Sequence, residues 1–393
     1  MFSLILFILI LSFLVLIHEF GHFFAAKKNG IKVEEFAIGF PPKLFAIKKG
    51  ETTYTINLFP LGGYVKLFGE EYQEIAAPQS KTTPHSPHPT PLNRAFAFKK
   101  PYQKAMVVAA GVCMNILFGV VILYGIIAFN GFKSDPLPLL FPHRFIFGTQ
   151  EGSVIATNLT KGSPAEKAGI KPEDIISSFS ITSDSTITHL SSAQQLIDMI
   201  KRSPGKKIFL ETVNLKNGAT KTIPVIPQYN KTLKRAIIGV SLIDGVVISY
   251  NKPIDKVLSG FMHSYNLLEY NFSAISQLIR LAFKEKSAAL VSGAVAGPVG
   301  IYGVVNDMVQ TSGAQLVKNI LNLMALLSLS LGVMNILPFP ALDGGRMVFV
   351  LYEWITGKQV NKKVESVTNV VGFVFLMGVA VLVSINDILR LFK

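Results

Sequence analysis

The sequence opens on MFSLILFILILSFLVLIHEFGH, residues 1–22, in which an apolar run leads directly into His18-Glu19-Phe20-Gly21-His22. In a helix, His18 and His22 lie one turn apart on the same face. Two imidazoles placed in this way can share one metal ion, and Glu19 beside them suits a general base. Ionisable side chains are costly in an apolar segment unless they are paired or bind a metal. The stretch therefore predicts a metal centre at the end of a membrane-spanning helix.

The composition indicates a polytopic membrane protein, because half of the 393 residues are hydrophobic and the mean hydropathy is +0.43. Four runs come close to the ~20 residues that a helix needs to cross a bilayer. They are residues 2–24, 106–129, 320–337 and 367–383. The first run has no basic residue before it and no small-residue cleavage pattern after it, so we expect it to be retained rather than removed as a signal peptide.

The net charge of +14 does not indicate nucleic-acid binding, because the sequence has no aromatic-and-basic recognition pattern. The basic residues instead cluster beside the predicted spans, which places these flanks in the cytoplasm. They are Lys27, Lys28, Lys99, Lys100, Lys104, Arg346, Lys358, Lys362 and Lys363. Both termini and the segment 131–315 are then expected outside. Cys113 is the only cysteine, so no internal disulfide is expected.

Two segments follow the first span. Residues 53–58 alternate polar with apolar side chains, residues 60–63 favour a turn, and residues 64–67 resume β character, which predicts a hairpin beside the membrane. Residues 76–91 are rich in Pro, Ser and Thr and are expected to form a linker. His85 and His88 lie in that linker, where we interpret them as solvated rather than metal-binding.

Residues 148–228 are predicted to form a separate α/β unit. Ser163, Pro164 and Glu166 carry the signals of a helix start, and Gly169 is a stop signal. A second helix is expected over residues 191–202, followed by strands at 207–215 and 219–226 around an Asn217-Gly218 turn. Residues 162–176, GSPAEKAGIKPEDII, resemble the bacterial PDZ signature. The resemblance implies one PDZ domain, which would add an extended peptide to its sheet or would only block access sterically.

Residues 252–290 carry apolar side chains at helical spacing from Val257 to Leu281. This pattern is equally typical of a helix that lies on the membrane surface and of one that packs against the preceding unit. Further on, residues 335–345 read NILPFPALDGG. Two prolines break the third span and two glycines permit a tight turn, so Asp343 is the candidate third ligand beside His18 and His22. A helix cap is its alternative role.

These motifs together resemble the site-2 protease family of intramembrane metalloproteases, of the bacterial regulator of sigma-E protease type. The pattern HExxH, the pattern NxxPxPxLDG, the intervening PDZ signature, residues 297–301 and Asn386-Asp387 occur in the family's order. Two stretches depart from it, at Gly39-Phe40-Pro41 and at residues 110–112. The resemblance implies a polytopic α-helical protein of the bacterial inner membrane, with a membrane-associated β-hairpin and an inserted extracytoplasmic PDZ domain between protease-core parts at residues 1–130 and 291–393.

Zn²⁺ is the expected cofactor, held by His18, His22 and Asp343, with Glu19 as general base. By resemblance, Asn335 binds the substrate backbone or the oxyanion, and otherwise it caps backbone freed near Pro338. The expected substrate contacts are Ile56, Asn57, Leu58, Pro338 and Pro340, with the strand edge at 56–58 receiving an unwound segment.

The substrates implied by resemblance are single-pass membrane proteins, such as anti-sigma factors and signal-peptide remnants. A membrane metal or proton transporter is the first alternative, and it would predict paired repeats with broken helices. A noncatalytic PDZ scaffold is the second, and it would not require Glu19 beside His18.

Overall fold

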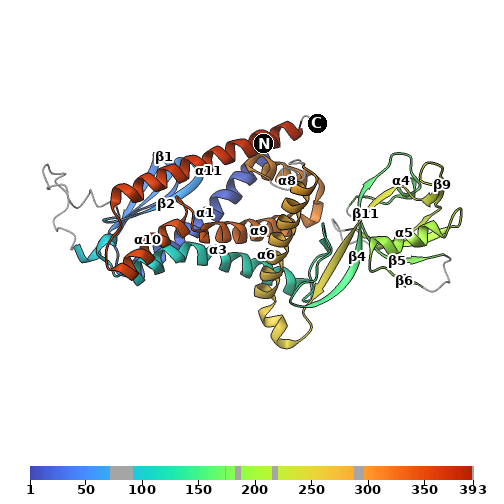
Figure 1. Cartoon of the computed structure of the whole chain (residues 1–393), viewed down its shortest axis with the longest axis horizontal. Coiled ribbons are helices and arrows are strands. Elements are labelled where there is room, and N and C mark those ends of the chain that lie inside the picture. The colour runs from blue at the N-terminus through green and yellow to red at the C-terminus, as the bar shows by residue number, and fades with distance from the viewer. Residues whose placement is uncertain (71–91, 173, 182–186, 215–219, 287–295, 392–393) are drawn as a thin grey trace. The chain divides into compact units, whose positions relative to one another are not determined.

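The computed structural model describes residues 1–70, 92–172, 174–181, 187–214, 220–286 and 296–391 (Figure 1). The expected linker at 76–91, with His85 and His88, and the turn at Asn217-Gly218 lie outside these residues. The α-helices are α1 (Phe2–Lys28), α3 (Pro101–Phe129), α4 (Pro164–Ala168), α5 (Ala193–Lys201), α6 (Pro253–Lys284), α8 (Pro298–Thr311), α9 (Leu316–Ile336), α10 (Asp343–Thr356) and α11 (Lys362–Leu391). Short 3-10 helices are η1 (Leu92–Arg94), η2 (Phe96–Phe98) and η3 (Gly313–Gln315).

The strands are β1 (Val33–Lys49), β2 (Thr52–Leu67), β3 (Leu137–Pro138), β4 (Thr149–Leu159), β5 (Asp174–Ser180), β6 (Thr188–His189), β7 (Ile208–Asn214), β8 (Thr220–Val225), β9 (Gln228–Asn230), β10 (Arg235–Ile237) and β11 (Val240–Ser249). The chain divides into two compact units. Unit 1 comprises Met1–Val121, Ser292–Asn306 and Leu323–Lys393, and unit 2 comprises Ile122–Val291 and Asp307–Asn322.

Four helices in the described part of the chain are long and apolar enough to cross a membrane. They are Phe2–Lys28, Pro101–Phe129, Gly313–Ile336 and Lys362–Arg390, and each contains or nearly contains one of the predicted spans. The helices extend beyond the apolar runs because basic residues such as Lys27 and Lys28 continue the helix while their charged ends can reach water. The chain is therefore a membrane protein with a β-rich domain.

The β-hairpin of unit 1 differs from the predicted one. Its turn lies at Gly50 and Glu51, and the segment 60–63, predicted as the turn, is a bend inside the continuous strand β2. Residues 53–56 and 63–66 of β2 do not pair with each other, because residues 35–38 of β1 run between them and pair with both. The chain does change direction at residues 60–63, but the two segments predicted to pair there are separated by residues 35–38.

Ion pairs hold the hairpin turn to the rest of unit 1. Glu51 accepts hydrogen bonds from Lys27 Nζ at 2.7 Å and from Arg94 Nη2 at 2.8 Å. The hydrogen bond from Arg94, together with the bond and the charge of Lys27, lowers the pKa of Glu51 to about 2. At the bend of β2, Ser12 Oγ of α1 donates to Pro60 O. These contacts fix the hairpin beside the helix that carries His18 and His22.

Unit 2 contains the predicted α/β elements. Ser163 caps α4 by accepting a hydrogen bond from Glu166 N, and Gly169 ends the helix at φ +92°. The helix α5 and the antiparallel strands β7 and β8 lie within the expected ranges 191–202, 207–215 and 219–226. Side chains of α5 such as Leu196 and Ile200 join strand residues in one buried core, so α5 covers a face of this sheet (Figure 1).

The sheet continues beyond residue 228, because β11 pairs antiparallel with β4 from Val240↔Leu159 to Ser249↔Thr149. Its strand order is β3-β11-β4-β5-β7-β8. Asp244 of β11 also caps α5 by accepting a hydrogen bond from Ala193 N at 2.7 Å. Residues after the predicted 148–228 segment thus complete the sheet and contact the helix that covers it.

Within unit 2, one side of the helix α6 packs through polar residues against the rest of the unit. His263 Nδ1 lies 3.1 Å from Tyr250 Oη, and Asn266 Nδ2 donates to Phe147 O at 2.9 Å. Burial lowers the pKa of His263 to about 4, so this packed face is uncharged near neutral pH. The opposite side exposes a row of large apolar side chains, including Val257, Phe261 and Phe272. The helix therefore packs against its unit and still presents an apolar surface.

Candidate metal centre

Two histidines on α1 face the inside of unit 1. His18 is buried and His22 is half-buried, and their rings meet edge to face with centroids 4.8 Å apart. This is the spacing expected of residues i and i+4 on a helix. The apolar residues before them carry the helix into the span, so both imidazoles lie at one end of a membrane-spanning segment.

Asp343 is the first residue of α10 and follows an irregular loop. Ala341 in this loop adopts φ +72°, which is rare for a residue with a side chain, and its N–H donates to Asn369 Oδ1 of α11 at 3.2 Å. Gly344 leaves no room for a Cβ, which would lie 2.1 Å from Leu337 O. The loop is folded tightly onto itself, and this fixes where the Asp343 carboxylate points.

His18 Nε2, His22 Nε2 and Asp343 Oδ2 form a small triangle. The nitrogens are 3.2 Å apart, and Oδ2 lies 3.0 Å from His18 Nε2 and 3.3 Å from His22 Nε2. Zinc bonds of about 2.0–2.1 Å at tetrahedral angles separate two ligand atoms by about 3.3–3.4 Å. Oδ2 is buried and accepts no hydrogen bond from the described residues, although it lies within ion-pair distance of both nitrogens. The donor set and its spacing fit a zinc ion.

Residues of the second span, α3, lie within hydrogen-bond distance of the Nδ1 atoms of both imidazole rings. His22 Nδ1 donates to Val107 O at 2.8 Å, so the proton is on Nδ1 and the lone pair of Nε2 faces the triangle. His18 Nδ1 lies 3.2 Å from the amide of Asn115, whose Oδ1 has no partner among the described residues. Rotation of that amide exchanges its oxygen and nitrogen. With Oδ1 toward the ring, Asn115 accepts the Nδ1 proton and frees His18 Nε2 for a metal.

Gly111 lets α3 approach the two histidines closely. A Cβ at this position would lie 2.5 Å from His22 Nε2 and 2.8 Å from His18 Cε1. Any side chain here would therefore displace the imidazoles or push α3 away from α1. The close packing of the two helices is what brings Val107 O and Asn115 within reach of the rings.

Asn115 is expected to tune metal affinity without binding the metal. Replacing Asn115 by Ala removes the acceptor for His18 Nδ1–H, so we expect zinc affinity to fall by about 10–100-fold, as for other partners of ligating histidines. Asn115→Asp keeps an acceptor and is expected to stay close to wild type. Competition with a fluorescent zinc chelator measures this, and Cys113→Ala, at an exposed position of the same helix, is the control. Wild-type zinc affinity in Asn115→Ala would contradict the role.

The remaining predicted catalytic residues lie on neighbouring elements. Glu19 is half-buried, and its Cγ is 3.7 Å from where a Cβ of Gly63 would lie on β2. Asn335 lies in the last turn of α9, half-buried, and its side chain forms no hydrogen bond with the described residues. Pro338 is exposed, whereas Pro340 packs against Gly372 of α11. Glu19 thus stands beside both the triangle and the hairpin.

Of the expected strand edge at Ile56, Asn57 and Leu58, the structure contradicts the part at Ile56. Ile56 pairs with both Ile38 and Phe45, and Asn57, which pairs with Lys43, is buried and donates from Nδ2 to Gly39 O at 2.9 Å. The prediction of an edge at Ile56 is wrong because residues 35–38 pair with residues 53–56 on the side that was expected to be open. Within the described residues, Gly63, Tyr64 and Val65 pair on one side only, which makes them an edge.

Sequence reasoning did not single out Asn115 or Asn369. Both are polar residues in otherwise apolar spans, and this is a signal that could have found them, because amides inside a membrane need partners. Their partners, His18 and the backbone of Ala341, are far away in sequence. The roles of the two residues became visible only once the spans were packed together.

Comparison with known proteins agrees with this chemistry. The sequence profile described as peptidase family M50 matches residues 6–379. A relative from Clostridium acetobutylicum described as a zinc metalloprotease is 33% identical over 98% of this chain and 97% of its own length. Zinc metalloprotease RasP of Oceanobacillus iheyensis is 29% identical over 99% of each chain, and RasP of Shouchella clausii is 28% identical over 100% of each.

Proposed function

Because this chain belongs to peptidase family M50 and is a zinc metalloprotease of the inner membrane, we propose that it hydrolyses peptide bonds within or near the transmembrane segments of single-pass proteins. The observation that carries the proposal is the triangle of His18, His22 and Asp343 with Glu19 beside it, at the end of an apolar helix. A site on a membrane-spanning helix can hydrolyse bonds that lie in the membrane, which soluble proteases do not reach.

We assign the zinc ligands to His18, His22 and Asp343. Zinc, when bound, polarises a peptide carbonyl and makes a water molecule acidic enough to act near neutral pH. Glu19 accepts the proton of the attacking water and returns it to the departing amine. Asn335, in the last turn of α9, donates from its amide to the substrate backbone or to the oxygen on which charge develops. Val107 O and Asn115 hold the two imidazoles in the required tautomers.

A transmembrane helix must unwind before its backbone can be hydrolysed, and the edge of β2 offers it a new set of partners. Backbone groups freed inside a membrane are costly unless they form hydrogen bonds again. We propose that the unwound segment pairs with Gly63, Tyr64 and Val65 by strand addition. The position of Gly63 beside Glu19 supports this, because a strand bound there would lie next to the catalytic carboxylate. Pro338 and Pro340 are proposed to contact the same substrate.

The unit over residues 148–228, completed by β11, is proposed to be a PDZ domain on the outer side of the membrane. Its support is the capped helix α4 within the PDZ-like signature and the sheet covered by α5. We propose that it binds an extended peptide and that α6, through its exposed apolar row that includes Val257, Phe261 and Phe272, rests on the bilayer surface. Both termini are then extracytoplasmic, and anti-sigma factors and signal-peptide remnants are proposed substrates.

Removal of zinc is expected to stop cleavage. The full chain, purified in detergent, is incubated with a single-pass substrate that carries a tag at each end, and the fragments are identified by mass spectrometry. A chelator is expected to abolish the fragments, and added Zn²⁺ to restore them, with cuts inside or at the border of the apolar segment. Cleavage that persists in protein shown to contain no zinc, or cuts confined to soluble flanks, would overturn the proposal.

A further inference from the structure

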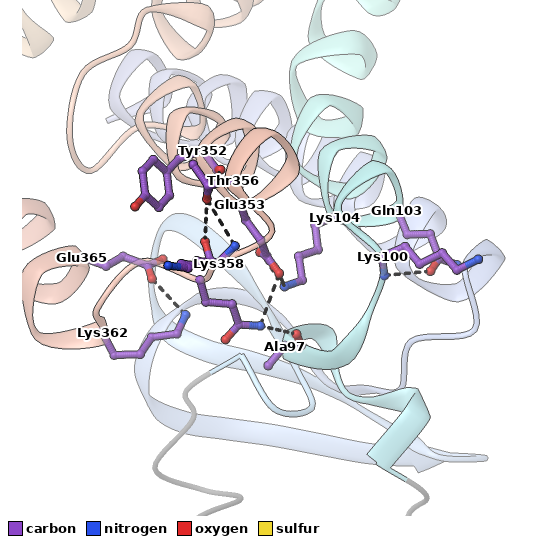
Figure 2. Close-up of polar contacts among 11 residues, drawn as sticks. Ala97, Lys100, Gln103, Lys104, Tyr352, Glu353, Thr356, Lys358, Lys362 and Glu365 are labelled. Carbon is purple, nitrogen blue, oxygen red and sulfur yellow. Dashed lines mark hydrogen bonds and ion pairs between the residues drawn. The ribbon is translucent and has the colours of Figure 1, made fainter.

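A buried ion pair joins two helices of unit 1 away from the metal centre. Lys104 Nζ lies 2.9 Å from Glu353 Oε1 and 2.8 Å from Oε2 (Figure 2). The side chain of Lys104 is only 5% exposed and that of Glu353 17%. Lys104 belongs to the first turn of α3 and Glu353 to the last turn of α10. A charge buried to this degree needs its partner, so the pair has one fixed geometry, unlike a mobile surface contact.

Neighbouring side chains reinforce the pair. Gln359 Nε2 donates to Ala97 O at 2.9 Å and to Glu353 Oε1 at 3.3 Å, which ties the end of α10 to the segment before α3. Both Lys104 and Arg346 make cation–π contacts with the ring of Phe96. Lys104 Nζ lies 6.0 Å from the ring centroid and Arg346 Cζ lies 4.7 Å from it. Arg346 follows Asp343 by three residues, so these contacts run along α10 toward the metal centre.

Both α3 and α10 also contribute residues at the metal centre. On α3, Lys104, Val107, Gly111 and Asn115 are spaced by three, four and four residues and share one face. The last three of them contact the histidines. On α10, Glu353 lies ten residues after Asp343, about 15 Å along the helix at ~1.5 Å per residue. The ion pair therefore fixes the far end of the helix whose near end carries Asp343.

We propose that Lys104 and Glu353 are a positioning pair, which holds α10 against α3 so that Asp343 stays within ligand distance of His18 and His22. The inference rests on the proposed zinc ligands and adds two residues that touch neither metal nor substrate. Without the pair, the Gln359–Ala97 hydrogen bond is the one of these contacts that still holds the end of α10, and a small sliding motion of the helix opens the triangle. Loss of the Lys104–Glu353 pair should therefore change the metal centre itself and not only the stability of the protein.

The test uses Lys104→Met, Glu353→Gln and the charge-swapped double variant K104E/E353K. Zinc affinity is measured by competition with a fluorescent chelator, and ligand geometry by the visible absorption of the Co²⁺-substituted protein. Each single variant is expected to weaken zinc affinity by about tenfold, toward the lower end of the range for outer residues that orient ligands. Each is also expected to change the Co²⁺ spectrum and to lower kcat more than KM. The double variant should restore most of the zinc affinity, of the Co²⁺ spectrum and of kcat.

Lys362→Met is the matched control, because it breaks an exposed ion pair with Glu365 at 2.9 Å in the same region (Figure 2). It is expected to behave as wild type. Folded single variants with wild-type zinc affinity and Co²⁺ spectrum would overturn the proposal, and so would losses that the charge swap does not recover. If Lys104→Met does not fold, Glu353→Gln, which keeps a hydrogen-bonding partner for Lys104, carries the test.

The assignment of the zinc ligands is checked in parallel with His18→Ala. If His18→Ala keeps full zinc affinity, the proposed metal site fails, whatever the pair does. If His18→Ala loses zinc and the single variants of the pair do not, only the positioning role fails. The two proposals can therefore be rejected separately.

Discussion

Replacing Glu19 by Gln is expected to lower substrate cleavage by about 10²–10⁴-fold, the range in which a positioned general base contributes. Glutamine has nearly the same size and cannot accept the proton of the attacking water. The side chain is half-buried between the triangle and Gly63 of β2, so the neutral amide fits without a new cavity. Single-turnover cleavage of the tagged substrate measures the loss.

The Glu19→Gln protein is expected to keep its zinc, because Glu19 is not part of the triangle of donor atoms. Zinc content and thermal stability are therefore measured on the same sample. A matched variant, Glu365→Gln, changes a glutamate that pairs with the exposed Lys362, and it should retain cleavage. Turnover by Glu19→Gln close to wild type would refute the role of this carboxylate as the base.

Replacing Asp343 by Ala is expected to abolish stoichiometric zinc binding at micromolar zinc. The change removes the only anionic atom of the triangle and leaves two imidazoles, fewer than the three protein ligands of a catalytic zinc site. The affinity loss should exceed the about 10–100-fold expected when only an outer partner such as Asn115 is removed. Metal analysis after gel filtration measures it, and cleavage should be lost in parallel.

Asp387→Asn is the control for Asp343→Ala, because Asp387 is also a buried aspartate in a membrane-spanning helix. Its Oδ2 accepts hydrogen bonds from Gly297 N and Gly300 N, both at 2.8 Å, and no metal-binding role is proposed for it. The control should keep zinc. If Asp343→Ala binds zinc as well as this control does, the third ligand has been assigned to the wrong residue.

The sequence determined the elements with short-range causes. The apolar runs specified four membrane-spanning helices, because a helix is the way for a continuous segment to satisfy its backbone inside a bilayer. The capping residues Ser163, Glu166 and Gly169 specified α4, since their partners lie within the same turn. The spacing of His18 and His22 specified two donors on one face, and the broken segment around Asp343 made that residue a candidate for the third.

Only the tertiary structure decided which distant segments meet. Residues 35–38 pair with both arms of β2, so Ile56 lies in an inner strand and the edge lies at Gly63. The triangle with Asp343, the partners of Asn115 and the pairing of Lys104 with Glu353 join residues from different helices. Hydropathy and helical period fix what each segment becomes, because they act between neighbours in the chain. Register and partner choice depend on packing between segments, which no local pattern in this sequence encodes.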